Sequence, residues 1–255
     1  MSLTVVGLGI TLGKHVSERT LSEIKAAEQV FALVDGMALA WLKRFRPDVI
    51  SLHPLYGNGD KSRRDAYQQM SQQLVEAAQS RHVCAVLYGH PGVFADVAHM
   101  AIGQLREQGI AAQMEPGVSA DACLYADLGI DPGKHGLISM EATHFLLFQR
   151  QLDPSMLVLL WQLGVTGDLR FTDPGTNRAR LALLAEKLAL YYPKTTPMLL
   201  YEAAQLAIQP MRAEAITLAQ LADAATSQIT TLVIPPQAPR RDRYWQQRLE
   251  ALQHH

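Results

Sequence analysis

Apolar runs of strand length alternate with amphipathic stretches of helix length through the first half of this 255-residue chain. This alternation is typical of α/β folds, in which helices cover a mainly parallel sheet. The runs are nearly continuous in hydrophobicity, as expected for strands buried on both faces. We predict strands at residues 3–9, 30–34, 49–56, 83–89 and 111–116, and helices at residues 20–29, 38–45, 62–79 and 94–107. Capping-box spacing marks two helix starts, Thr20 with Glu23 and Ser62 with Asp65.

The rhythm changes after residue 117. A helix at 119–129 is followed by apolar strands at 136–141, 156–164, 197–205 and 229–236, and a long helix at 178–192 interrupts them. This mixture predicts a second α/β lobe with partly antiparallel pairing. We therefore expect an N-terminal lobe over 1–117, a C-terminal lobe over 118–236 and a basic helical tail over 237–255.

Composition narrows the function classes. A formal net charge of −1 gives no reason to expect nucleic acid or an acidic membrane as a partner. No apolar stretch approaches the roughly 20 residues of a membrane span. The first ten residues lack the basic region of a signal peptide and read as a strand. Cys84 and Cys123 both lie in apolar runs, which favours buried thiols over a disulfide. We predict a soluble cytoplasmic protein.

Three glycine-rich turns follow predicted strands, where open α/β sheets bind their ligands. They are Gly7-Leu-Gly9, Gly89-His-Pro-Gly92 and Pro116-Gly-Val-Ser119. The first is no dinucleotide fingerprint, and the chain has no Walker sequence, zinc-ligand spacing or G-x-S-x-G motif. Such turns suit a nucleotide-like ligand without a polyphosphate, of which S-adenosylmethionine is one.

Three stretches together, "VVGLG", "YGHPGVF" (88–94) and "EPGVSADAC" (115–123), resemble the tetrapyrrole methylase superfamily. The resemblance extends to about residue 236. It is closer to the borosin-type peptide backbone α-N-methyltransferases, on the stretches "SMEATHFL" (139–146), "LLWQLGVTG" (159–167) and "LLYEA" (199–203). It implies a two-lobed α/β enzyme that binds S-adenosylmethionine between its lobes, without a metal, releases S-adenosylhomocysteine and forms a homodimer. His90 stands where the tetrapyrrole branch usually has an aspartate, which favours the peptide branch.

The same resemblance implies the cofactor contacts. In the first lobe they are Gly7, Gly9, Tyr88, His90, Pro91, Val93, Phe94, Ala95, Ser119 and Ala120; in the second they are Gln162, Tyr201 and Thr231. Some of these residues also fit structural roles. His90 suits a turn as well as a cofactor contact, Phe94 suits the core as well as an adenine platform, and Gln162 could bond a neighbouring loop.

A second cluster, at "LYGNGDKSRRDAYQQM" (55–70), carries the candidate catalytic residues. If Ser62 caps the helix, Arg63 and Tyr67 stand four apart on one face, and Tyr56 ends the preceding strand nearby. The peptide branch has a Tyr followed by Arg-x-x-x-Tyr here, although the linker after Tyr56 is about two residues shorter than expected. A peptide nitrogen is a poor nucleophile, so a guanidinium that stabilises an oxyanion and a phenolate that takes the proton would serve its methylation. Alternatively, Tyr67 edges a buried helix face that includes Met70, Leu74 and Ala77.

The expected substrate is a separate precursor peptide, because the charged tail holds no run of Val, Ile, Gly or Ala to be methylated. The resemblance implies a helical leader on that precursor and a heterotetramer of two enzymes with two precursors. Two alternatives stay open. One is C-methylation of a corrin or porphyrin precursor. The other is a non-catalytic peptide-binding or cofactor-sensing scaffold that keeps the fold. Arg63→Ala and Tyr67→Phe test the catalytic hypothesis against it: if cofactor still binds and turnover is unaffected, the proposed catalytic roles are wrong.

Overall fold

The computed structural model describes residues 1–56, 62–168 and 177–252, and in this part the chain forms two compact units. Of the described residues, the first unit comprises those up to residue 130, Asp168 and residues 202–212, and the second comprises the others. Helix α5 (Ala120–Leu128) thus belongs to the first unit, whereas the sequence analysis placed it in the second lobe. No helix of the described part is long and apolar enough to cross a membrane.

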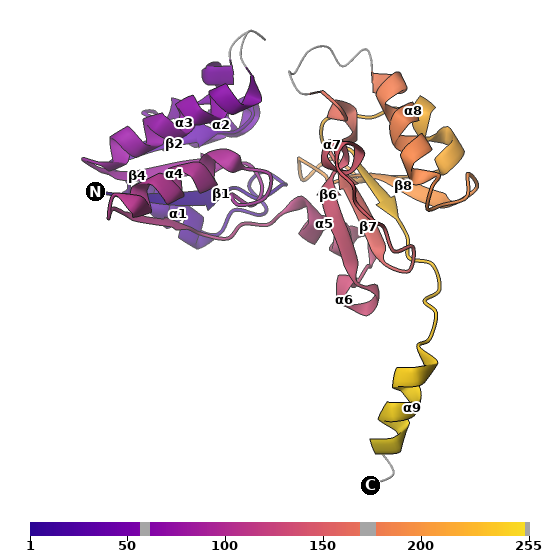
Figure 1. Cartoon of the computed structure of the whole chain (residues 1–255). Coiled ribbons are helices and arrows are strands. Elements are labelled where there is room, and N and C mark those ends of the chain that lie inside the picture. Colours follow the sequence, from indigo (N-terminus) through magenta and orange to yellow (C-terminus); the bar gives the residue numbers. More distant parts are fainter. Residues whose placement is uncertain (57–61, 169–176, 253–255) are drawn as a thin grey trace. The chain divides into compact units, whose positions relative to one another are not determined.

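The first unit is built on a parallel sheet of five strands within the described residues, in the order β3-β2-β4-β1-β5. Figure 1 shows it in indigo to magenta, with helices on both faces of the sheet. The strands are β1 (Ser2–Gly7), β2 (Gln29–Leu33), β3 (Ile50–Ser51), β4 (His82–Leu87) and β5 (Ala111–Met114). The helices between them are α1 (Glu18–Ala26), α2 (Gly36–Lys43), α3 (Arg63–Ala78) and α4 (Asp96–Glu107).

Side-chain alternation along β1 and β4 explains this double cover. Leu3 and Val5 face the core formed with α3 and α4, while Val6 and Leu8 face the core formed with α1 and α2. Successive residues of a strand point to opposite faces, so a continuous apolar run buries both. The predicted parallel sheet is confirmed.

Two local predictions in this unit were wrong. The first helix begins at Glu18, because the Ser17 hydroxyl accepts from the Thr20 amide at 3.0 Å. Thr20 is therefore not the N-cap. The predicted strand over 49–56 pairs only at Ile50 and Ser51 and then becomes a 3₁₀ turn, η1 (His53–Tyr56). Pro54 lies in that turn and has no amide for a further ladder bond.

The second unit contains a mixed sheet of five strands within the described residues, in the order β6-β7-β10-β8-β9. β6 pairs with β7 in parallel, and β10 pairs antiparallel with both β7 and β8, as predicted. The strands are β6 (Leu137–Glu141), β7 (Leu157–Trp161), β8 (Pro197–Glu202), β9 (Arg212–Thr217) and β10 (Thr231–Ile234). The sequence analysis missed β9, of whose six residues three are exposed and one is buried, so that it carries little apolar signal.

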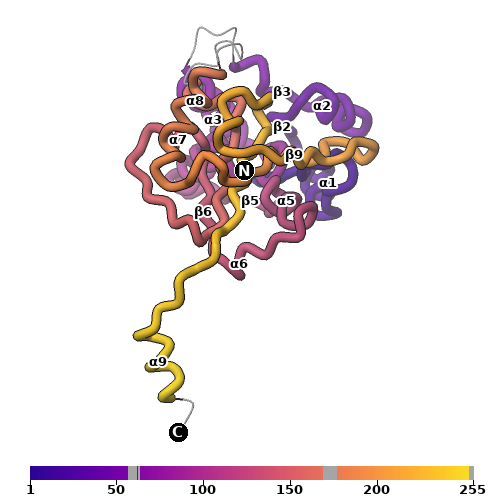
Figure 2. The backbone as a smooth tube through the Cα atoms, turned by 90° about the vertical axis from the view of Figure 1, so that its right-hand side faces the viewer, coloured from indigo at the N-terminus to yellow at the C-terminus, as the bar shows by residue number. Residues whose placement is uncertain are grey.

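Short helical segments complete this unit: α6 (Pro132–His135), α7 (Ala142–Leu147), η2 (Leu163–Val165), α8 (Asn177–Leu188), η4 (Leu218–Asp223) and α9 (Arg243–Leu252). α7 and α8 lie side by side (Figures 1 and 2). The Lys187 ammonium joins them by donating to the carbonyl oxygens of Phe145, Leu146 and Phe148 at 2.6, 3.1 and 2.7 Å. A cation at a helix C-terminus is favourable because the last carbonyls lack partners within the helix.

Candidate active site

Three glycines bring the predicted turns together at the carboxyl edge of the first sheet. Gly9 and Gly89 exchange backbone hydrogen bonds of 3.2 and 3.0 Å. A Cβ on Gly7 would overlap the carbonyl oxygen of Gly89, and a Cβ on Gly117 would lie 2.7 Å from that same oxygen. Only glycine allows main chains to approach this closely. The result is a cradle of closely packed main chain, in which Gly7, Gly9 and Gly89 are buried and Gly117 is partly buried.

The turn after β4 uses His90 structurally. Its Nδ1 accepts from the Gly92 amide at 2.9 Å, and His99 Nε2 lies 2.9 Å from the Gly92 carbonyl oxygen. These bonds support the structural role of His90 in the turn. Because its Nδ1 is engaged, a hydrogen bond to a cofactor would have to come from its Nε2. Pro91 is buried, and its ring lies close enough to Gly7 to exclude a side chain there.

Among the described residues, the non-glycine residues with positive φ are Phe94 (52°) and Gln162 (62°). Each such conformation costs about 1–3 kcal/mol and persists where the surroundings impose it, commonly at ligand sites. Phe94 is 48% exposed and Val93 45%, so the core interpretation of Phe94 was wrong. An accessible ring of this kind is what the other interpretation, an adenine platform, requires.

Two helices begin at these turns. α4 follows Ala95, and no side chain of the described residues caps it there. α5 follows Ser119 and starts at Ala120, but the Ser119 hydroxyl donates to Asp121 Oδ1 instead of accepting from the helix. The third amide of each helix is engaged, since Ala98 N donates to Ala95 O and Ala122 N donates to the Asp121 carboxylate. The first two amides of each helix have no side-chain cap and are the ones that could bind a carboxylate.

In the second unit, strand pairing brings the predicted residues together. Thr231 pairs with Tyr201 across β10 and β8, and both are 1% exposed. The Leu163 amide, directly after Gln162, donates to Thr230 O at 2.9 Å. Gln162, Tyr201 and Thr231 are thus neighbours at one end of the mixed sheet.

The turn after Gln162 is fixed by residues that the sequence analysis did not single out. The Leu163 carbonyl oxygen accepts from the Thr166 hydroxyl at 2.9 Å and from Asn177 Nδ2 at 3.1 Å. Asn177 Nδ2 also donates to Thr226 Oγ1 at 2.8 Å. A lone asparagine at a helix start gives no sequence signal for this role, because its partners lie 14 and 49 residues away.

The candidate catalytic tyrosines are close together. The Tyr56 and Tyr67 ring centroids are 6.1 Å apart at an interplanar angle of 72°, an edge-to-face pair, and both rings pack partly against the α3/α4 core. Tyr67 therefore edges the buried helix face, as one of the two interpretations expected, while still facing Tyr56. Ser62 caps α3 as predicted, accepting from the Asp65 amide at 3.2 Å, and Arg63 is the first helical residue. The Arg63 side chain and residues 57–61 lie outside the described part.

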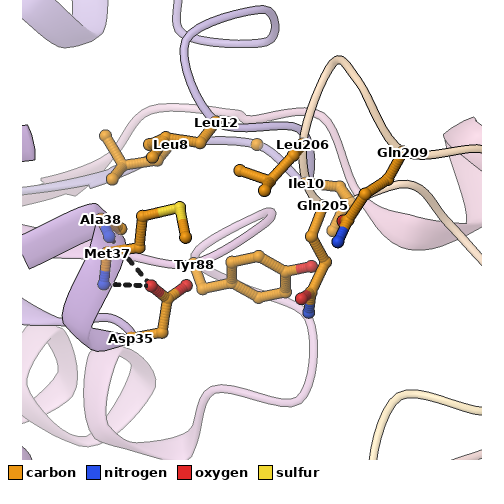
Figure 3. A pocket seen from close by; sticks show the side chains of 11 residues that line it. Leu8, Ile10, Leu12, Asp35, Met37, Ala38, Tyr88, Gln205, Leu206 and Gln209 are labelled. Atoms are coloured by element: carbon orange, nitrogen blue, oxygen red, sulfur yellow. Dashed lines mark hydrogen bonds between the residues drawn. The ribbon is translucent and has the colours of Figure 1, made fainter.

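A cavity of about 120 Å³ opens beside Tyr88 and Gly9 in the first unit (Figure 3). The Asp35 carboxylate lies at its edge and accepts from the Met37 and Ala38 amides at 2.8 and 2.9 Å. Burial raises the pKa of the Tyr88 hydroxyl above its ordinary value, although a hydrogen bond with Gln205 acts in the opposite direction. Gln205, Leu206 and Gln209 close the cavity. The sequence analysis extended a strand to residue 205, but β8 ends at Glu202 and the chain then returns to the first unit.

A doubly covered parallel sheet with a glycine cradle at its carboxyl edge, joined to a mixed sheet, defines an α/β methylase class of fold. Two solved structures share it: the uroporphyrin-III-C-methyltransferase of Thermus thermophilus (TM-score 0.65, 19% identity, 92% of each chain) and a diphthine synthase (TM-score 0.65, 18% identity, 94% of this chain and 92% of that one). The family model for Tetrapyrrole (Corrin/Porphyrin) Methylases matches residues 2–225. The chain belongs to the tetrapyrrole methylase family.

Curated relatives indicate which members of this family the chain is similar to in sequence. The chain is 36% identical over 241 residues to the "methyltransferase/ribosomally synthesized cyclic peptide gymnopeptides precursor" of Gymnopus fusipes, covering 92% of this chain and 57% of that protein. It is 35% identical over 243 residues to the corresponding omphalotin A precursor of Omphalotus olearius, covering 93% and 58%. The chain thus spans little more than half the length of these relatives, whose names combine an enzyme with a precursor peptide.

Proposed function

We propose that this chain is an S-adenosylmethionine-dependent methyltransferase that methylates backbone amide nitrogens of a ribosomal precursor peptide. The observation that carries the proposal is the Tyr56–Tyr67 pair beside the start of α3, where Arg63 begins the helix. The peptide-precursor relatives support the same substrate class.

The glycine cradle supports the cofactor part of the proposal. Gly7 and Gly117 let the turns after β1 and β5 pack directly against the main chain at Gly89, which brings three strand ends to one point. Phe94 presents an exposed ring, and the Ala120 and Asp121 amides at the start of α5 are proposed to meet the carboxylate of the methionine end. The other proposed contacts are Gly9, Tyr88, His90, Pro91, Val93, Ala95, Ser119 and Ala120 from the first unit, and Gln162, Tyr201 and Thr231 from the second. When bound, the sulfonium supplies an electrophilic methyl group.

The proposed chemistry follows from the amide. Its nitrogen lone pair is delocalised into the carbonyl, so the proton must leave while negative charge grows on the oxygen. The Arg63 guanidinium stabilises that oxyanion, and Tyr67, acting as a phenolate, takes the proton. Tyr56 packs edge-on against Tyr67 and holds its ring in place. Correct placement of the nitrogen in line with the methyl group supplies the remaining rate acceleration.

The proposed substrate is a separate precursor with a helical leader, bound by a homodimer of the enzyme as a heterotetramer. The test is co-expression with any small peptide found to be encoded beside the gene, followed by intact mass measurement of that peptide. A second arm joins the same peptide to the C-terminus of this chain. Methyl additions in the first arm support action in trans, and additions in the second arm alone restrict the enzyme to action in cis.

Absence of methyl additions in both arms, with S-adenosylmethionine bound, would overturn the proposed function. The second candidate, C-methylation of a corrin or porphyrin precursor, would instead give an absorption change on mixing with a porphyrinogen. The observation that favours this second candidate is the fold shared with the uroporphyrin methyltransferase.

A further inference from the structure

The cavity beside Tyr88 shares Gly9 and Tyr88 with the proposed cofactor contacts, but the roles above do not use the rest of its lining. Four segments of the first unit form its wall: the loop after β1, the start of α2, residues 205–209, and Tyr88 after β4 (Figure 3). Two hydrogen bonds fix the third segment to the first. The Leu12 amide donates to Gln205 O at 3.0 Å, and the Thr11 hydroxyl donates to Ala204 O at 2.7 Å. The cavity is therefore a preformed feature of the fold.

Its size selects one kind of occupant. Sites for drug-sized ligands have volumes of roughly 300–1,000 Å³, so about 120 Å³ is too little for a whole nucleoside. An apolar cavity of about 150 Å³ can hold benzene. The space therefore matches one aliphatic side chain.

The chemistry of the wall agrees with that size. Its apolar side chains are Leu8, Ile10, Leu12, Met37, Ala38 and Leu206. Met37 is 56% exposed, and an unbranched thioether adapts to side chains of different shape. The Asp35 carboxylate is occupied by the first amides of α2, which offsets its charge at the edge of the cavity.

Two amides stand at the rim of the cavity. Gln205 and Gln209 each carry a donor and an acceptor, the pair of groups that a peptide backbone also presents. Figure 3 shows the Tyr88 hydroxyl pointing toward Gln205. An aliphatic side chain in the cavity would thus place its own backbone within reach of these amides.

The cavity also lies at the same sheet edge as the tyrosine pair. In the strand order β3-β2-β4-β1, Tyr56 comes after β3, Asp35 after β2, Tyr88 after β4 and Gly9 after β1. Parallel strands place all these positions at one edge. A peptide whose amide lies near Tyr56 therefore has the cavity along its path.

We infer that this cavity is a specificity subsite that takes an aliphatic side chain of the peptide substrate while Gln205 and Gln209 bond the adjoining backbone. The inference deepens the proposed function and depends on it. In this role, Met37 and Leu206 select peptide residues by the size of their side chains.

The experiment measures peptide binding without turnover. The full chain is labelled with ¹³C at its methionine methyl groups, saturated with S-adenosylhomocysteine, and titrated with acetyl-Gly-Val-Ile-Gly-amide; Met37→Leu assigns the Met37 resonance. We expect the Met37 methyl resonance to shift, and acetyl-Gly-Gly-Gly-Gly-amide to leave it in place.

Leu206→Trp fills the cavity and raises the Kd of the apolar peptide by about tenfold or more, as expected for losing a buried side chain. Ile208→Trp is the matched control, since Ile208 is on the same segment and 91% exposed; it changes the Kd less than about twofold.

Several outcomes overturn the subsite. They are a Met37 resonance that the apolar peptide does not move, equal shifts with both peptides, an unchanged Kd in Leu206→Trp, and a shift caused by S-adenosylhomocysteine alone, which would make the cavity part of the cofactor site. Calorimetry of S-adenosylmethionine with Leu206→Trp confirms that the variant is folded. A peptide that binds at Met37 but is never methylated overturns the proposed function instead, so the two failures are distinguishable.

Discussion

Replacing Gly117 by alanine tests the glycine cradle most directly. The new Cβ would lie 2.7 Å from Gly89 O and 3.2 Å from Gly7 Cα. Close carbon–oxygen contacts in proteins lie at about 3.3–3.6 Å, so the shortfall from Gly89 O is about 0.6 Å. Both neighbours are main-chain atoms, and Gly89 is held by its two bonds with Gly9, so no flexible side chain can yield.

Overpacking of this kind costs about 1–3 kcal/mol of unfolding free energy. We expect Gly117→Ala to lower the urea midpoint accordingly and to weaken S-adenosylmethionine binding by about tenfold, which corresponds to about 1.4 kcal/mol. Urea denaturation followed by circular dichroism measures the first quantity, and titration calorimetry measures the second.

Gly103→Ala is the matched control. Gly103 lies inside α4, and a Cβ there would have no heavy atom within 4 Å. Alanine should stabilise that helix by about 0.5–1 kcal/mol and leave cofactor affinity unchanged. Our account of the cradle is refuted if Gly117→Ala matches the wild type in both midpoint and affinity.

Three further predictions concern other parts of the chain. Tyr67→Phe keeps the ring contact with Tyr56 but removes the proposed base, so methylation measured by intact mass should slow by about 10²–10⁴-fold with cofactor affinity unchanged; unchanged turnover would exclude the role. Lys187→Met removes three hydrogen bonds to carbonyls at the end of α7 and should destabilise the second unit by about 1.5–3 kcal/mol in urea unfolding; a midpoint equal to that of the wild type would contradict it. The Arg46 guanidinium lowers the pKa of Asp48 from 3.8 to about 2, so the stability that Asp48 contributes is present above pH 4 and is lost as the pH falls toward 2. Asp48→Asn should reduce the loss of unfolding free energy between pH 4 and pH 2, measured by urea denaturation at each pH. An unchanged pH dependence would show that the Arg46–Asp48 pair does not stabilise the fold.

Where a sequence signal was local, it predicted the structure well. Ser62 and Asp65 lie within one helical turn, and α3 begins directly after Ser62, whose hydroxyl accepts from the Asp65 amide. The apolar runs of β1 and β4 required burial on both faces, and the sheet provides it. The Thr20 prediction failed because Ser17 offers a competing hydroxyl three residues earlier, and the geometry of the chain entering the helix selects between them.

Signals that depend on distant partners could not be found in this way. The cavity needs residues 205–209 to return to the loop after β1, and Asn177 fixes the turn after Gln162 from 14 residues away. Exposed strands such as β9 have no apolar periodicity to reveal them.

The sequence by itself determined the α/β class, the division into a parallel and a mixed sheet, and the three glycine turns, because hydrophobic periodicity and glycine placement act through near neighbours. Only the tertiary structure decided that those turns share one carbonyl oxygen, that Phe94 is exposed, that Tyr56 meets Tyr67, and that a side-chain-sized cavity opens beside Tyr88. These features arise from contacts between segments far apart in the chain, whose approach is set by the packing of the whole unit and not by any single stretch.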